Sequence, residues 1–306
     1  MRALISIAVA SLIIGVQPCQ AQTTGSEHDP AKAGPHEATA ASGSGLRILA
    51  GYEVHRDHLR YTFANRSNID TDFLVPHTFT QAYVANNQWL VVSAAYPLGS
   101  NQWETEFAIT PERQTPGSDL DTFYNPNNDV VVSGTDGEVR LRSFRLAQWS
   151  DGRVWGLPWR MGYRYRRDHS QFLPTDRIVT HSNPPSEVRS STYGHETTIS
   201  QAHEISIDVS KPSSLSPSWG LIVRAGMSPL IWARLTTILP DKYPGRQIVF
   251  DAKAGGAEGR VALIWRKRRP IVLEMTYGRT WSYSAARQFR RDALQGSVGI
   301  GFGPEP

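Results

Sequence analysis

The chain has 306 residues and a net charge of +4, and its basic residues are not gathered into charged tails, which argues against a nucleic-acid-binding protein. Beyond its start, no apolar run reaches the roughly 18 residues of a membrane-spanning helix. Nine tryptophans and eleven tyrosines are a heavy load of amphipathic side chains, which are favoured where an apolar surface meets water.

The first 21 residues are predicted to be a secretory signal peptide. Arg2 supplies a positive start, residues 3–16 are apolar, and Ala21 is the small residue expected before a cleavage site. A membrane anchor is the alternative, but the run is short for one, and a lipoprotein signal would need small residues before Cys19. Cys19 is the only cysteine, so the processed chain is expected to lack disulfides. Residues 22–45 have the composition of a disordered lead-in.

From residue 46 to residue 303 apolar and polar side chains alternate between turn-rich stretches, and no helical period is sustained. The clearest example is WRMGYRYRRD at 159–168, where arginines alternate with large apolar and aromatic residues. Successive side chains of a strand point to opposite faces, so each strand has an apolar face and a polar face. The same alternation recurs at 199–208, 218–228, 271–278 and 297–302.

Two all-β folds fit this alternation. A two-sheet sandwich buries the apolar face, whereas a membrane barrel turns it toward lipid and keeps polar and small residues in its lumen. The predicted signal peptide, the lack of cysteine after Cys19, the aromatic load and Phe302 near the C-terminus favour the barrel. We therefore predict a closed antiparallel transmembrane β-barrel over residues 46–303, monomeric and located in the outer membrane of a Gram-negative cell.

Turn signals predict the topology. Short turns are expected at Asn86-Asn87, 150–158, 211–217 and 267–270, and longer loops near 65–73, 111–136, 173–192, 239–246 and 286–291. Short periplasmic turns that alternate with longer extracellular loops give ten strands, an even number that closes an antiparallel barrel. A further turn at 97–101 would raise the count to twelve. Several strands exceed the 9–11 residues that cross a bilayer, so their outer halves are expected to project above the membrane.

Two short motifs lie in the predicted long loops. SDLDTFYNP places Asp119 and Asp121 one residue apart, so in extended geometry both carboxylates point the same way and prepare a shared proton or a bound water. LPDKYPGR places Asp241 and Tyr243 with the same spacing. Together with ten strands and long outer loops, these motifs resemble the omptins, outer-membrane proteases that cleave at basic residues and depend on lipopolysaccharide.

The resemblance implies a water activated between an Asp pair and an Asp-His couple. Asp119 and Asp121 match the pair, Asp241 matches the Asp of the couple, and Tyr243 stands where the family has its His. Tyrosine ionises near pH 10 and is a poor base at neutral pH, so His169 is the candidate substitute if it lies near Asp121. The implied partners are lipopolysaccharide and a basic peptide. No His, Cys or Glu cluster has metal spacing and there is no phosphate-binding glycine loop, so no cofactor is expected.

Several functions remain open at this level. The first is an omptin-like barrel with an active or degenerate protease site. The second is a narrow passive channel that favours anions, and the others are a structural barrel that presents loops or, less favoured, a lipid hydrolase. In a barrel this narrow the lumen residues would also form ion pairs that plug it. The predicted lumen residues are Arg140, Arg142, Arg160, Arg164, Arg166, Arg224, Glu204, Asp208 and Glu274.

Overall fold

The computed structural model of the chain describes residues 45–65, 77–98, 101–125, 127–154, 157–190, 194–238, 245 and 247–303. The predicted signal peptide lies outside the described residues, as does the lead-in apart from its last residue. Among the described residues, no helix is long and apolar enough to cross a membrane.

The described segments form eleven β-strands. Their bounds are β1 Arg47–Asn65, β2 His77–Leu98, β3 Asn101–Tyr124, β4 Val130–Val154, β5 Leu157–Ser182, β6 Pro185–Ser190, β7 Glu196–Ser216, β8 Trp219–Ile238, β9 Gln247–Trp265, β10 Ile271–Ser282 and β11 Arg287–Phe302. The alternation at 159–168 has its predicted consequence in β5, because Arg160 and Arg166 are buried while Met161 and Tyr163 are exposed on the outer surface.

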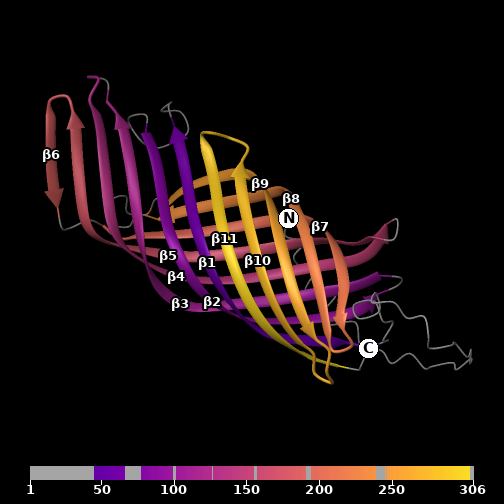
Figure 1. The fold of residues 1–306 in the computed structure, drawn as a ribbon. Coiled ribbons are helices and arrows are strands. Elements are labelled where there is room, and N and C mark those ends of the chain that lie inside the picture. Colours follow the sequence, from indigo (N-terminus) through magenta and orange to yellow (C-terminus); the bar gives the residue numbers. More distant parts are fainter. Residues whose placement is uncertain are drawn as a thin grey trace, which may run out of the picture. The chain divides into compact units, whose positions relative to one another are not determined.

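Ten of these strands close into an antiparallel barrel. Each pairs with its sequence neighbour, β1 pairs with β11, and β5 pairs with both β4 and β7. The short β6 pairs with β5 alone and extends that hairpin beyond the barrel wall, at the upper left of Figure 1. The predicted all-β class, antiparallel closure and count of ten are confirmed.

The connections at one end are short, and we call it the inner end. At this end the strands are joined across positions 99–100, 155–156, 217–218 and 266–270. The first residue of β1, Arg47, and the last residue of β11, Phe302, also lie at this end.

The predicted turn at Asn86-Asn87 is wrong. These asparagines continue the β1–β2 ladder opposite Arg56 and His55, and only the β2–β3 ladder shifts register, between Tyr83 and Leu90. β2 instead continues to Leu98 and β3 begins at Asn101, so the number of strands in the barrel stays at ten.

At the opposite end, which we call the outer end, β1 and β8 finish and β2 and β9 begin. The loops predicted near 65–73 and 239–246 lie almost wholly outside the described residues. The loops predicted at 111–136, 173–192 and 286–291 are mostly strand. β3 continues to Tyr124, β4 begins at Val130, and β5 continues to Ser182. These stretches are polar because they project from the barrel wall, but continuous cross-strand pairing holds them extended. A polar strand with water outside it resembles a loop in composition.

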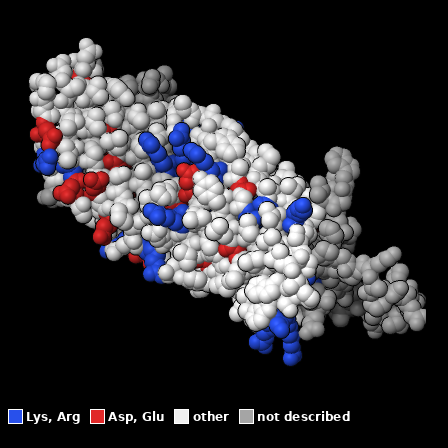
Figure 2. Space-filling view, viewed as in Figure 1, with Lys and Arg blue, Asp and Glu red and all other residues white. Residues whose placement is uncertain are grey.

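Large apolar side chains remain exposed on the outward face of the inner half, and we call them the apolar belt. A belt that faces solvent in an isolated chain is typical of a surface meant for lipid. The outer half carries most of the charged side chains on the face in Figure 2. The belt includes Ile48, Tyr52, Val54, Leu90, Val92, Phe107, Ile109, Leu146, Met161, Tyr163, Ile205, Ile207, Val223, Met227, Val261, Leu263, Leu273, Met275, Leu294, Val298 and Ile300.

The interior has two layers of opposite character. The inner half is filled by ion-paired arginines and acidic residues, which we call the charged layer. The outer half is filled by a buried apolar cluster, which we call the outer core. The outer core comprises Leu59, Tyr61, Phe63, Tyr83, Ala85, Val139, Leu141, Phe172, Ile231, Ala233, Leu235, Phe250, Ala252, Ala254 and Phe289.

Candidate functional site

The predicted aspartate pair lies inside the outer half of the barrel. Asp119 and Asp121 are in β3 rather than in a loop, and both are buried, whereas Leu120 between them is exposed. Asp119 is opposite Gln81 of β2 and Thr135 of β4, which are also buried. The expectation that the two carboxylates share a face therefore rests on strand alternation, not on loop geometry.

A third carboxylate joins this pair. Glu196, the first residue of β7, is 1% exposed, and burial together with the charges of Asp119 and Asp121 raises the pKa of its carboxyl well above the ordinary value. The charges of the two aspartates thus act on Glu196, and all three side chains are buried, so we call them the acidic site. Sequence reasoning missed Glu196, although it shares the parity of Glu204 in the same strand.

The other members of the predicted catalytic set are not brought to the acidic site by the described residues. Asp241 and Tyr243 lie outside those residues. His169 is not the substitute base, because its neighbours Asp168 and Ser170 point inward and its own side chain lies on the outer surface. It is opposite Arg142 in the β4–β5 ladder, whereas Asp121 is level with Ser133, so the two are also far apart along the wall.

In the charged layer, arginines and acidic residues from strands all around the barrel pair with one another. Arg145 bonds Glu53 at 2.9 Å and Glu106 at 2.6 Å, and Arg166 bonds Asp57 at 3.0 Å and Asp168 at 2.8 Å. The guanidinium groups of Arg145 and Arg166 each lie 5.3 Å from the ring centre of Trp89, which is fully buried. These contacts tie strands on different sides of the barrel together across the lumen.

Most of the predicted lumen residues lie in this layer. Arg160, Arg164, Arg224, Glu204 and Glu274 line one cavity within it, and Arg166 and Asp208 are buried beside the cavity. Glu258 and Arg260, which belong to the cavity as well, were missed in the sequence. Their alternation in GAEGRVAL is the signal that could have found them.

Arg140 and Arg142 do not line the lumen. Both are exposed, whereas Val139 and Leu141 beside them are 1% exposed and belong to the outer core. The prediction assigned every alternating arginine to a wet lumen. In the outer half water surrounds the wall, so the apolar face turns inward and the charged face outward.

An aromatic cluster marks the outer wall where the apolar belt gives way to polar residues. The Tyr163 hydroxyl oxygen is 2.6 Å from Nδ1 of His203. The centre of the His203 ring lies 5.1 Å from the ring centre of Trp232, on which it stacks, and 4.9 Å from the ring centre of Tyr165. Arg234 lies over the Trp232 ring. His203 lies on the same outward face as the exposed Ile205 and Ile207, and a cluster of this composition is typical of a membrane–water interface.

The described residues contain no group of three or more His, Cys, Asp or Glu side chains that could hold a metal ion. Three carboxylates that interact in a buried space favour a shared proton, because not all of them can carry a negative charge at once.

Comparisons with known proteins concern the fold. No family model and no curated protein matches the chain. Among solved structures, the outer membrane protease OmpT from Escherichia coli aligns with a TM-score of 0.57 at 8% identity, over 86% of this chain and 98% of OmpT. An outer membrane channel from Pseudomonas putida F1 aligns with a TM-score of 0.37 at 11% identity, over 90% and 100% of the two chains. The translocator domain of the autotransporter NalP from Neisseria meningitidis aligns with a TM-score of 0.34 at 12% identity, over 88% and 91%. The alignment with OmpT and the strand pairing show that the chain is a closed ten-stranded antiparallel β-barrel, a fold that outer-membrane proteins have.

Proposed function

We propose that this chain is an omptin-like outer-membrane β-barrel that takes basic peptides at the acidic site of its outer end and hydrolyses them. The observation that carries the proposal is the gathering of Asp119, Asp121 and Glu196 inside the outer half of a barrel whose lumen is filled below them. The fold similarity to OmpT, described as an outer membrane protease, supports the same reading.

The exterior supports the membrane placement. The apolar belt covers the inner half, and just above it exposed arginines follow the outward face of β1 and β11. Arg60 is directly opposite Arg290 in the ladder, and Figure 2 shows basic side chains gathered over the outer parts of these strands. Like charges at this spacing repel each other unless an anion lies between them. Phosphate groups of lipopolysaccharide at the membrane surface are the partner that we propose for these arginines.

The chemistry follows from the protonation of the acidic site. The raised pKa of Glu196 lets this carboxyl exchange a proton closer to neutral pH than an ordinary glutamic acid does. A water held among the three carboxylates gives its proton to Glu196 as its oxygen bonds to the peptide carbonyl carbon. Glu196 then gives the proton to the leaving amine as the C–N bond breaks. The negative charge of Asp119 and Asp121 also attracts the basic residue of the substrate.

The passive channel is the weaker candidate. The outer core fills the interior with Tyr61, Phe172, Phe250 and other buried side chains, and the charged layer bridges the lumen beneath it. In a planar bilayer we expect the folded protein to show no stepwise conductance, and Arg164→Glu to change nothing in that trace. Stable anion-selective steps in the wild type would favour the channel instead.

The peptidase test uses protein refolded in detergent with lipopolysaccharide and a fluorogenic peptide that carries two adjacent basic residues. Asp121→Asn and Glu196→Gln are each expected to lower kcat roughly a hundredfold or more, the usual contribution of an acid–base group. Glu138→Gln, which changes an exposed glutamate of β4, is the matched control and should keep the wild-type rate. A wild type that neither cleaves nor saturably binds the peptide would rule the proposal out.

Tyr243 allows a gain-of-function test of the same idea. In the sequence motif that resembles the omptins, Tyr243 stands where the family has a histidine, and imidazole is the better proton acceptor at neutral pH. Tyr243→His is therefore expected to raise kcat. Its kcat should also increase as pH rises through about 6.5, the ordinary pKa of histidine. Tyr243→Phe is the control for a change in the ring alone. Equal rates in all three proteins would mean that position 243 takes no part in the reaction.

A further inference from the structure

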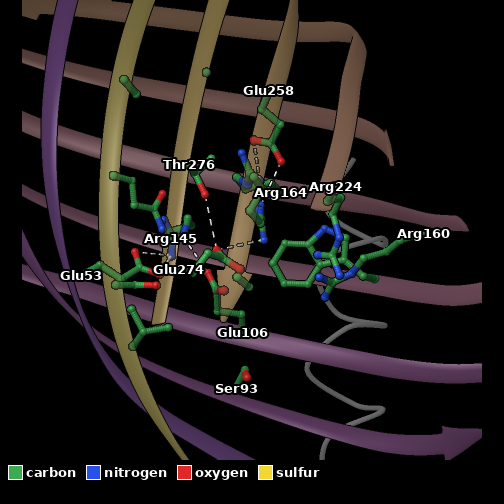
Figure 3. A pocket seen from close by; sticks show the side chains of 18 of the residues that line it. Glu53, Ser93, Glu106, Arg145, Arg160, Arg164, Arg224, Glu258, Glu274 and Thr276 are labelled. Atoms are coloured by element: carbon green, nitrogen blue, oxygen red, sulfur yellow. Dashed lines mark hydrogen bonds and ion pairs between the residues drawn. The ribbon is translucent and has the colours of Figure 1, made fainter. Parts of the chain in front are cut away.

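The charged layer encloses a cavity of about 330 Å³ in the inner half of the barrel (Figure 3). Its lining reaches from Leu49 and Gly299 near the inner end to Glu53 and Arg291 deeper in the barrel. On β1 the outer core begins only at Leu59, beyond these residues. The cavity is therefore separated from the outer end by apolar packing and lies toward the inner end.

The charges that line this cavity do not pair off completely. Its six glutamates, Glu53, Glu104, Glu106, Glu204, Glu258 and Glu274, all bond to arginines. Six of its seven arginines, Arg145, Arg160, Arg164, Arg260, Arg279 and Arg291, have an acidic partner as well. The seventh is Arg224. Within the part of the chain that the structure describes, Arg224 makes no ion pair and no hydrogen bond.

Two other arginines crowd Arg224, and the carboxylates whose charges act on it, Glu274 and Asp208, form no ion pair with it in the described part of the chain. Its ladder partner on β9 is Arg260 and its partner on β7 is Ser210. Arg160 and Arg260 are close enough to repel its guanidinium group, and Figure 3 shows the nitrogens of Arg160 and Arg224 side by side. The Nε atom of Arg224 is enclosed and has no partner among the described residues. A half-buried guanidinium group that lies beside two others and is bonded to no described carboxylate favours a further counter-ion.

The protein itself offers two rival counter-ions, Glu274 and Asp208, because the charges of both act on Arg224. Glu274 lines the cavity but already pairs with Arg260 at 3.5 Å. Asp208 lies opposite Gly226, two residues from Arg224 along β8, and is 2% exposed. It forms no ion pair with Arg224 among the described residues and does not line the cavity. Asp208 is opposite Arg160 on its other side. Asp208 therefore lies near Arg224 without bonding to it, whereas Arg224 itself is part of the cavity lining.

We propose that Arg224 binds a small soluble oxyanion, of phosphate or carboxylate chemistry, inside this cavity. Arginine presents several N–H donors in one plane, which match two oxygens of such an anion. The anion enters from the inner end, because the outer core closes the other side. The cavity holds a solute of a few heavy atoms together with water, so inorganic phosphate and acetate are the probes. This site is independent of the acidic site and of the proposed peptidase activity.

The binding test uses protein refolded in non-ionic detergent, in chloride buffer without phosphate, carboxylate or phospholipid. Titration calorimetry with sodium phosphate and with sodium acetate, at matched ionic strength, is expected to give saturable binding of one anion per chain. Arg224→Gln should weaken it roughly tenfold or more, since a charged hydrogen-bond partner is lost. Arg268→Gln, an exposed arginine of the β9–β10 turn, should bind as the wild type does. Binding that is absent, unchanged in Arg224→Gln, or seen only with a phospholipid headgroup would overturn the proposal.

A second measurement separates a bound anion from a hidden partner within the protein. In the anion-free buffer, Arg224→Gln is expected to leave Tm unchanged or to raise it, because the substitution removes an uncompensated charge. Arg164→Gln should lower Tm, because it leaves Glu204 and Glu258 short of a partner. Phosphate should then raise Tm in the wild type and not in Arg224→Gln. A fall in Tm for Arg224→Gln as large as that for Arg164→Gln would mean that Asp208 or another protein group already compensates Arg224.

Discussion

The inner and outer halves of the barrel use the same strands with opposite polarity. On β1, Ile48, Tyr52 and Val54 face outward in the inner half, with Glu53 and Asp57 inside. A few residues further along the same strand, the outward positions are Arg56, His58 and Arg60, and the inward positions are Leu59, Tyr61 and Phe63. The apolar and polar side chains therefore change faces within a single continuous strand. The same change of faces occurs in β4 and β9.

This exchange teaches that the medium outside the wall decides which face is polar. Where lipid surrounds the wall, apolar side chains face out and the interior takes the charged groups, which must pair because they lie away from bulk water. Where water surrounds it, the barrel behaves like a soluble β-barrel with an apolar core. The outer core then supports the acidic site from below and closes the lumen.

The largest effect is expected from a cavity in the outer core. Phe172 of β5 is 1% exposed, and Phe172→Ala should lower the free energy of unfolding by about 3–5 kcal/mol. Urea unfolding in detergent, followed by tryptophan fluorescence, measures it. Met161→Ala, which shortens an exposed side chain of the apolar belt in the same strand, is the control and should cost far less. Similar losses for both variants would mean that the outer half has no core of its own.

A charge on the apolar belt tests the inner half. Val298 of β11 is exposed there, and Val298→Arg should destabilise the barrel in lipid bilayers by roughly 2–4 kcal/mol if it lies near the middle of the hydrocarbon layer. His58→Arg makes the corresponding change on the outward face of the outer half and should be nearly neutral. Folding equilibria in vesicles measure both. An equal and small effect would place the membrane elsewhere on the wall.

The acidic site should make stability depend on pH. The pKa of Glu196 is raised in the folded protein by burial and by the charges of Asp119 and Asp121, so the folded state holds this proton more tightly than the unfolded chain. The stability that Glu196 contributes is fully present below pH 4.5, the ordinary pKa of a glutamic acid, and is lost as pH rises through its raised pKa in the folded protein. Glu196→Gln should flatten the decrease in Tm over that range, and Glu138→Gln should not. A wild-type Tm that rises with pH there would contradict the expected sign.

The smallest effect is expected at the tip of the outer end. Asp129 accepts hydrogen bonds from His181 at 2.9 Å and from the backbone N–H groups of Ser182 and Asn183, and these bonds lower the pKa of its carboxyl to about 2. The stabilisation from these hydrogen bonds to Asp129 is fully present above pH 3.8, the ordinary pKa of an aspartic acid, and is lost as pH falls through about 2. Asp129→Ala should speed hydrogen exchange in the β5–β6 hairpin and leave Tm nearly unchanged. Unchanged exchange would mean that the hairpin holds without it.

Local pattern predicts much of this fold and less of its site. Alternating arginines and aromatics in 159–168 were sufficient to indicate the inward face of β5, and the turns near 155, 217 and 267 follow from local composition. Asn86-Asn87 has the composition of a turn, but pairing with β1 holds it extended. The pairing partner lies about thirty residues away in the sequence, since Asn86 is opposite Arg56, and no local rule contains it.

The amino-acid sequence by itself determined the antiparallel strands, their alternation, the even number that closes the barrel and the spacing that puts Asp119 and Asp121 on one face. Those features depend on neighbours one or two positions apart. Only the tertiary structure decided that Arg140 and Arg142 face outward, that Glu196 joins the aspartates, and that Arg224 remains without a partner beside a cavity. Each of these depends on which strands meet across the interior and on the medium outside the wall, and both arise only when the barrel closes.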